Sequence, residues 1–115
     1  MKKIEAYIKQ HKLTEVTMGL QKINGLRGMS VSDVRGFGWR SDKDAARLMS
    51  DDLLDFAPYV RIEIYCYDDL VDTLVSVIDK SAQTGLRGDG KIYVSDVETA
   101  YKIGKGVINN HKKGE

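Results

Sequence analysis

The sequence predicts an α+β fold in which two strand–helix–strand halves follow one another, in the order βαββαβ. Three observations support this prediction. Four segments alternate apolar with polar residues as strands do, two others repeat apolar residues every three or four positions as helices do, and glycines cluster between them. At 115 residues, of which 42% are hydrophobic, the chain fits a single domain, residues 1–115, with one core.

The first half contains a strand, a helix and a second strand. Apolar residues at every second position predict a strand over residues 2–9. Apolar residues spaced by four and three predict a helix over residues 14–23, with Thr14 at its N-cap and an Asn-Gly pair after its end. Residues 29–35, MSVSDVR, alternate again and predict the second strand.

The second half repeats this order. Residues 59–67 form the clearest alternating segment of the chain and predict a strand. Asp68 and Asp69 then stand as candidate N-caps of a helix that runs to about residue 82. Residues 91–97 predict a shorter fourth strand, and a polar, basic tail follows.

This order is that of the ferredoxin-like fold, in which two helices cover one face of a four-stranded antiparallel sheet. The second face of the sheet must then be polar or covered by another molecule, so we expect oligomerisation. Many unrelated functions share this architecture, and the function has to be sought in the loops.

Residues 39–57, between the second and third predicted strands, are polar and have little periodicity. They predict a long loop. Structureless loops of this length are uncommon inside compact domains and usually bind something. This segment therefore favours a recognition role.

The charge balance and the single cysteine exclude several classes of protein. Because 18 Lys and Arg face 17 Asp and Glu, the formal net charge is +1 and no long-range field attracts nucleic acid or anionic lipid. The N-terminus lacks the apolar run of a signal peptide, and charges interrupt every apolar stretch that could span a membrane. Cys66 cannot form an intrachain disulfide, and we expect it to be buried in a protein of the cytoplasm.

The most informative stretch is TGLRGDGKI, residues 84–92, between the second helix and the last strand. Its three glycines permit positive φ angles and let a ligand approach backbone amides closely, as phosphate binding requires. Arg87 and Lys91 add positive charge, whereas Asp89 could accept from a sugar hydroxyl or hold the turn. An ordinary glycine turn is the competing interpretation. A Walker A loop is excluded, since Ile92 stands where a magnesium-binding Ser or Thr is needed and a strand follows in place of a helix.

At this nonapeptide the sequence resembles the PII signal-transduction family, whose B-loop reads T-G-x-x-G-D-G-K-I/V. The resemblance covers about residues 1–103, including MKKIEAYIK, KL-x-E-V, GMSVSDVRGFG and DF-x-P-x-V-x-IEI. It implies a homotrimer of ferredoxin-like subunits that binds ATP or ADP in clefts between subunits. The T-loop, about residues 38–57, would contact a membrane transporter or a metabolic enzyme. The B-loop would be residues 84–91, and the C-terminal segment 98–115.

The resemblance also implies which residues would bind the nucleotide. Lys91 is the clearest phosphate partner, and Lys102 would reach phosphates from a neighbouring subunit. Trp39, at the root of the T-loop, would stack on adenine, anchor a partner or simply pack on the sheet. The complete set comprises Ser30 near the adenine, Gly36, Phe37, Gly38, Trp39 and Arg40 at the T-loop base, Glu63 and Tyr65 on the third strand, Thr84, Gly85, Gly88, Asp89, Gly90 and Lys91 in the B-loop, and Lys102.

The T-loop base departs from family members that sense 2-oxoglutarate. Arg40 stands where they place a glutamine that helps to hold magnesium, and Tyr59 where they place a lysine that pairs with the acid. We therefore expect the usual magnesium–ATP–2-oxoglutarate site to be missing, while Arg40 is a candidate for a carboxylate, bicarbonate or a terminal phosphate. Gly104 replaces the second of two C-terminal basic residues, and Lys102 stands at the first. We expect the loss of a bidentate guanidinium to weaken or retune phosphate binding, because a lysine supplies only a point charge. Asp52 replaces the tyrosine that some relatives uridylylate, which excludes that modification there.

These observations predict a non-enzymatic regulator that senses an adenine nucleotide, ATP or ADP with AMP as a further candidate. Two alternatives stay open: a slow nucleotide hydrolase or phosphotransferase using the same cleft, and a trimeric ferredoxin-like protein, such as a metal-tolerance protein, whose glycine turn binds nothing. No Ser-His-Asp, Cys-His or paired-carboxylate arrangement points to catalysis. His11, His111 and the aspartates of residues 42–55 lack the spacing of a metal site. We expect neither nucleic acid binding nor direct membrane insertion.

Overall fold

The structure is a computed structural model that describes residues 1–36 and 57–109. Single-turn 3-10 helices lie at Gln10–Lys12 and Asp68–Leu70, each directly before a longer helix. The other elements, in chain order, are β1 (Lys2–Lys9), α1 (Leu13–Gln21), β2 (Ser30–Gly36), β3 (Ala57–Cys66), α3 (Val71–Ala82), β4 (Gly90–Asp96), β5 (Tyr101–Lys102) and β6 (Gly106–Val107).

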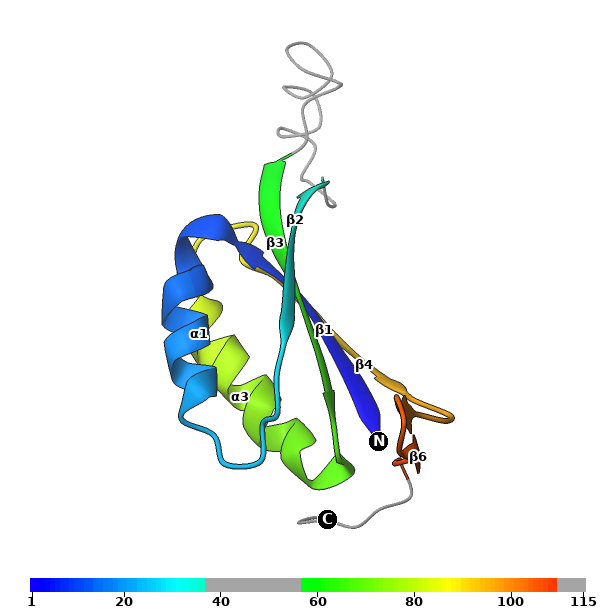
Figure 1. The fold of residues 1–115 in the computed structure, drawn as a ribbon. Coiled ribbons are helices and arrows are strands. Elements are labelled where there is room, and N and C mark those ends of the chain that lie inside the picture. The colour runs from blue at the N-terminus through cyan, green and yellow to red at the C-terminus, as the bar shows by residue number, and fades with distance from the viewer. Residues whose placement is uncertain (37–56, 110–115) are drawn as a thin grey trace.

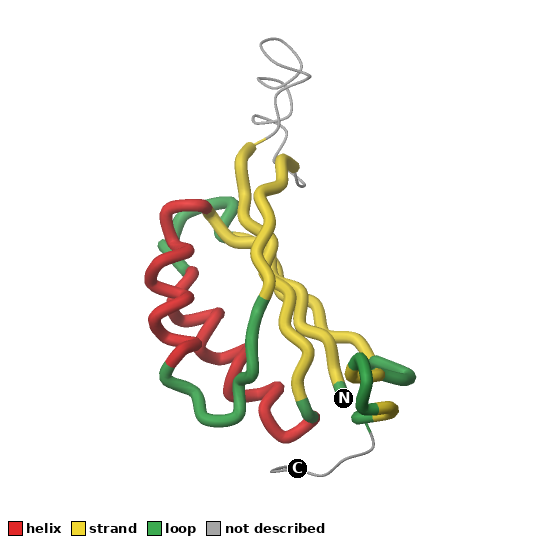
Figure 2. The backbone as a smooth tube through the Cα atoms, in the orientation of Figure 1, coloured by secondary structure: helices red, strands yellow, loops and turns green. Residues whose placement is uncertain are grey.

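The four long strands, β1 to β4, form one antiparallel sheet in the order β2-β3-β1-β4, and the helices α1 and α3 cover one face of it (Figures 1 and 2). In β1, Lys2 pairs with Cys66 and Lys9 pairs with Tyr59, so β3 runs beside β1 over the whole length of β1. Ile8 of β1 pairs with Gly90, the first residue of β4. The predicted βαββαβ order and the four-stranded sheet are confirmed.

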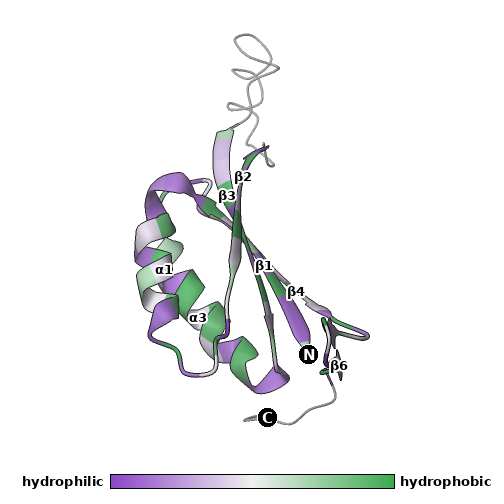
Figure 3. Ribbon diagram, viewed as in Figure 1, coloured by the Kyte–Doolittle hydropathy of each residue, from purple (hydrophilic) through white to green (hydrophobic). Residues whose placement is uncertain are grey.

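The core lies between the sheet and the two helices, and alternate strand residues supply it. Figure 3 shows the apolar residues on the strands and on the inner faces of both helices. Cys66 is among the buried residues, as the sequence predicts. The buried hydrophobic residues are Ile4, Ala6, Ile8, Val16, Leu20, Val60, Ile62, Ile64, Cys66, Leu74, Ile78 and Ala82.

The opposite face of the sheet, which no helix covers, carries ion pairs at its centre. The Glu63 carboxylate lies 3.2 Å from the Nε of Arg61 and 3.8 Å from the Nζ of Lys3. Lys3 also lies 3.7 Å from the carboxylate of Glu5. Tyr93, which pairs with Glu5 and so shares this face, is half exposed. We call this surface the open face, and its polarity agrees with the requirement set out above.

The predicted helix N-caps are wrong. The helix α1 begins at Leu13 with Lys12 at its N-cap, so Thr14 lies inside the helix, and no side chain caps it. Likewise Leu70 occupies the N-cap of α3, because Asp68 and Asp69 belong to the preceding 3-10 turn. Each strand–helix connection turns through a 3-10 segment whose own hydrogen bonds satisfy backbone groups there.

The tail contains structure that the sequence pattern did not predict. Two-residue strands β5 and β6 form a small hairpin in which Tyr101 pairs with Val107. Gly104 and Gly106 take positive φ values in it, 80° and 86°. The predicted loop over residues 39–57 lies outside the described residues except for Ala57, which begins β3. In the described part of the chain, no helix is long and apolar enough to cross a membrane.

Candidate functional site

The glycine-rich segment between α3 and β4 forms a tight turn against β1. Gly85, Gly88 and Gly90 have φ values of 81°, 77° and 119°, a region that favours glycine. At Gly90 a Cβ atom would lie 1.7 Å from the carbonyl oxygen of Tyr7. The backbone of the turn therefore passes so close to β1 that only glycine fits at residue 90.

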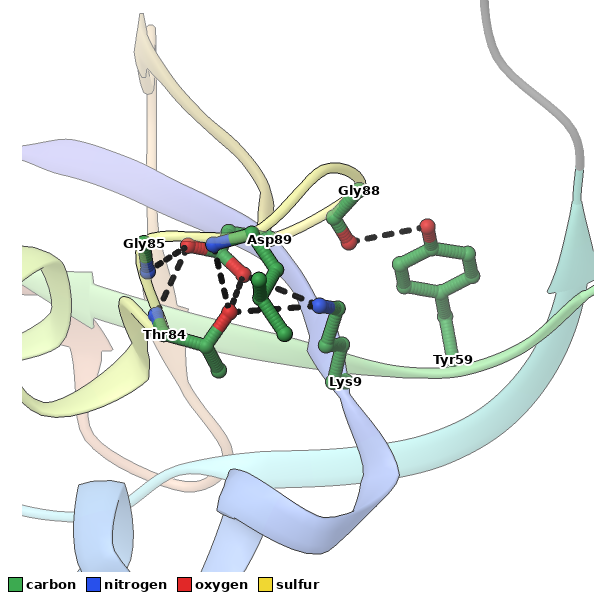
Figure 4. A network of polar contacts seen from close by, with 7 residues as sticks. Lys9, Tyr59, Thr84, Gly85, Gly88 and Asp89 are labelled. Atoms are coloured by element: carbon green, nitrogen blue, oxygen red, sulfur yellow. Dashed lines mark hydrogen bonds and ion pairs between the residues drawn. The ribbon is translucent and has the colours of Figure 1, made fainter. Parts of the chain in front are cut away.

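Asp89 holds this turn together from the inside (Figure 4). Its carboxylate accepts hydrogen bonds from the Thr84 backbone N–H at 2.7 Å, the Gly85 N–H at 3.2 Å and the Thr84 hydroxyl. The Nζ of Lys9 lies 3.1 Å from the same carboxylate. These donors, the Thr84 hydroxyl foremost, hold the pKa of Asp89 well below its usual range. Of the two roles considered for Asp89, holding the turn is the one that the structure displays.

Two side chains from the neighbouring strands β1 and β3 also bind the turn. The hydroxyl of Tyr59 donates a hydrogen bond to the carbonyl oxygen of Gly88 at 2.9 Å. Lys9, the register partner of Tyr59 on β1, reaches both Asp89 and the Thr84 hydroxyl oxygen, the latter at 3.3 Å. Figure 4 shows both side chains pointing from the sheet toward the turn. The position of the turn is thus tied to the ends of β1 and β3.

A pocket of about 600 Å³ opens between this turn and the strands. It brings together five of the predicted nucleotide-binding positions, namely Gly36, Gly88, Asp89, Gly90 and Lys91. Its remaining lining comes from Tyr7, Val34, Arg35, Tyr59 and Tyr93.

Sequence reasoning did not place the tyrosines in this site. Tyr7, Tyr59 and Tyr93 occupy the polar positions of three alternating strands, so the alternation itself puts them on the open face. The alternation does not predict the strand register, which places Tyr7 opposite Lys91 and Tyr59 opposite Lys9. Tyr7 and Tyr93 form an edge-to-face pair with ring centroids 6.2 Å apart.

Comparisons with known proteins agree on one family. The family model described as nitrogen regulatory protein P-II matches residues 1–107. The nitrogen regulatory protein P-II of Bradyrhizobium diazoefficiens is 45% identical over 106 residues, which cover 92% of this chain and 94% of that protein. The P-II protein of Klebsiella oxytoca and P-II 1 of Escherichia coli are each 44% identical over the same extent.

The chain belongs to the nitrogen regulatory protein P-II family. P-II proteins are trimers of ferredoxin-like subunits and non-enzymatic signal transducers that regulate enzymes or transporters. The predicted family, fold class and regulatory role are therefore confirmed, and the hydrolase alternative finds no support. Among the described residues, no group of three or more His, Cys, Asp and Glu side chains could hold a metal ion.

The other predicted P-II site residues are not gathered in the pocket of a single chain. Glu63 and its register partner Ser30 lie on the open face, about 13 Å along β3 from Tyr59 at about 3.3 Å per residue. Tyr65 follows them, further from the turn, and is 54% exposed. Lys102 lies in the β5–β6 hairpin, at the end of the sheet opposite the glycine turn (Figure 1). The predicted positions Phe37, Gly38, Trp39 and Arg40 lie outside the described residues.

Proposed function

We propose that this P-II chain forms a homotrimer that binds ATP or ADP, with AMP as a further candidate, between its subunits. The bound nucleotide would control a membrane transporter or a metabolic enzyme in the cytoplasm through the T-loop, about residues 38–57. The observation that carries the proposal is the pocket of about 600 Å³ beside the glycine turn. Gly88, Gly90 and Lys91 all line this pocket.

The chemistry of the turn suits a polyphosphate. Glycines with positive φ let backbone N–H groups approach phosphate oxygens without a side chain in the way. Lys91, the second residue of β4, is exposed and supplies a positive charge at the pocket. Asp89, whose negative charge would oppose a phosphate, has its carboxylate bound by the turn itself and by Lys9.

A second subunit would complete the site. Within one chain Lys102 is at the far end of the sheet from the turn, so it can only serve phosphates that a neighbouring chain holds. Glu63, Ser30 and Tyr65 lie along the open face, where a nucleoside extending from the turn would meet them. This division explains why the pocket of one chain holds only part of the expected set.

Tyr59 supports the absence of the usual 2-oxoglutarate response. Its side chain carries no positive charge to pair with the acid, and its hydroxyl already donates to Gly88. We propose instead that the signal is the identity of the bound nucleotide, with Arg40 as the candidate residue for an anionic second effector such as bicarbonate. Occupancy changes T-loop binding only if the nucleotide favours one loop arrangement over another, and the partner must then alter nucleotide affinity by the same factor.

Isothermal titration calorimetry tests this proposal directly. ATP, ADP and AMP are titrated with and without magnesium, and with and without 2-oxoglutarate. We expect nucleotide binding that 2-oxoglutarate does not strengthen. Lys91→Ala should weaken nucleotide binding by about 1–3 kcal/mol, because a charged hydrogen bond to phosphate is lost, while the trimer stays intact in sedimentation.

The matched control is Lys80→Ala, which removes an exposed lysine from α3. It should bind nucleotide as the unaltered chain does. The proposal fails if the unaltered trimer binds none of the three nucleotides. Equal affinity in the Lys91 variant would move the phosphates away from the glycine turn.

A further inference from the structure

One hydrogen bond joins the start of β3 to the glycine turn. Tyr59 is the third residue of β3, which begins at Ala57 directly after residues 37–56. Its hydroxyl reaches the Gly88 carbonyl oxygen at 2.9 Å. Glycine favours this contact, because residue 88 has a φ of 77° and a Cβ there would lie 3.0 Å from the Tyr59 hydroxyl oxygen. The Tyr59 side chain, on the strand that follows the T-loop, therefore contacts the backbone of the proposed phosphate-binding turn.

This bond fixes the direction of one peptide group. In a trans peptide the carbonyl of Gly88 and the N–H of Asp89 point in opposite directions, so holding one holds the other. While the carbonyl accepts the Tyr59 hydroxyl proton, that hydrogen bond offsets its negative end in the pocket that Gly88, Asp89 and Tyr59 line together. Without the phenol, Gly88, which carries no side chain, offers little resistance to rotation of this peptide.

Lys9 and Tyr59 contact different parts of the turn. Lys9 holds Asp89 and Thr84, which shape the beginning of the turn. Tyr59 holds Gly88 and has no part in the Asp89 cluster. Removing the Tyr59 hydroxyl should therefore leave the Asp89 cluster in place and release only the Gly88–Asp89 peptide.

We propose that Tyr59 is a positioning residue of the nucleotide site: its hydroxyl orients the Gly88–Asp89 peptide for phosphate and transmits occupancy to the start of β3. This inference rests on the proposed function, because it assumes that phosphates bind at the turn. It adds a named residue and a physical route from the turn to the strand that leaves the T-loop.

The test compares Tyr59→Phe with Tyr67→Phe. The hydroxyl of Tyr67 also donates to a backbone carbonyl, that of Ile108, so the control loses the same kind of bond just beyond the other end of β3. We expect Tyr59→Phe to bind ATP and ADP about 3- to 10-fold more weakly, the range expected for one neutral hydrogen bond. Tyr67→Phe should bind within twofold of the unaltered chain, and p-aminophenylalanine at position 59, which restores a donor, should recover affinity.

Hydrogen exchange separates positioning from a general loss of stability. In the ligand-free trimer, Tyr59→Phe should raise amide exchange in residues 86–90 and leave α1 unchanged. In the unaltered chain, ATP should slow exchange at residues 57–60, and this protection should be lost in Tyr59→Phe but kept in Tyr67→Phe.

The outcomes distinguish the two proposals. If the unaltered trimer binds no nucleotide, the proposed function fails and this inference fails with it. If the unaltered chain binds nucleotide but Tyr59→Phe has the same affinity and the same exchange at 57–60, this inference alone is overturned. Equal losses in Tyr59→Phe and Tyr67→Phe would also overturn it, since both would then reflect stability only.

Discussion

The carboxylate of Asp89 shows how one side chain shapes the candidate site. It accepts two backbone N–H groups and a hydroxyl from the start of the turn, and its neighbour Lys9 comes from β1. Each of these donors stabilises the ionised form. An acid in the middle of the glycine turn is thus a structural element, and its charge is directed into the turn.

This arrangement makes the turn sensitive to acid. The carboxyl of an unfolded Asp titrates near 3.8, and the folded pKa of Asp89 lies lower because of Thr84, the turn amides and Lys9. The stabilisation is therefore present above about pH 4 and lost as the pH falls through the folded pKa. Asp89→Asn should be less stable than the unaltered chain at pH 7, and urea unfolding should show that its stability falls less between pH 5 and pH 3.

The control for this pH series is Asp79→Asn, on the exposed surface of α3. Its stability should follow that of the unaltered chain across the series. A steep acid loss that persists in Asp89→Asn would assign the acid sensitivity to another group.

At the residue scale, the sequence predicts which residues form the turn better than it predicts their contacts. The three glycines and Lys91 mark the turn, and the positive φ values agree with that prediction. The sequence alone does not decide whether Asp89 contacts a sugar or supports the turn, because that depends on where Lys9 of β1 lies. Tyr59 stands out in the sequence only as a replacement for a lysine, and its bond to Gly88 follows from strand register, which the sequence does not encode locally.

At the scale of elements, burial decides what can be predicted. The strands β1 and β3 alternate buried with mostly half-buried positions, so periodicity predicts them to within two residues. The N-caps were missed because the chain enters both helices through 3-10 turns. The β5–β6 hairpin has two residues per strand and no buried residue, so it leaves no periodic signal.

The contact between the two helices gives a prediction at this scale. A Cβ at Gly19 of α1 would lie 2.9 Å from the Cγ1 of Val77 on α3. Alanine gains about 1 kcal/mol of helix propensity over glycine, but here the new methyl group meets a stiff β-branched side chain. Gly19→Ala should therefore be more favourable by about 1 kcal/mol in a Val77→Ala background than in the unaltered chain.

A double-mutant cycle in urea measures this coupling. Both single variants, the double variant and the unaltered chain are compared at one pH. Additive effects would mean that the helices adjust without cost and that Gly19 is not needed for their close approach.

At the scale of the whole molecule, one face of the sheet is sealed by helices and the other is open. The open face carries ion pairs around Glu63 and half-exposed tyrosines, and the β5–β6 hairpin adds strongly exposed apolar side chains. Since P-II proteins are trimers, we expect these surfaces to lie in contacts between subunits. The sequence predicted this need from the fold alone, since two helices cannot cover both faces of a four-stranded sheet.

Ile103 gives the clearest test of that assembly. It is 99% exposed in the single chain, beside Lys102, which the proposed site places against a neighbouring subunit. Burying an isoleucine side chain contributes roughly 1.5–3 kcal/mol, and a buried carboxylate there would add a desolvation cost. Ile103→Glu should thus raise the dissociation constant of the trimer tenfold or more, measured by sedimentation equilibrium, while the circular dichroism spectrum stays unchanged.

The control is Met18→Glu, which places the same charge on an exposed apolar position of α1 and should leave the trimer intact. A trimer of undiminished strength in Ile103→Glu would place the hairpin outside the interface, and with it the expected contact of Lys102 with a neighbour's phosphates.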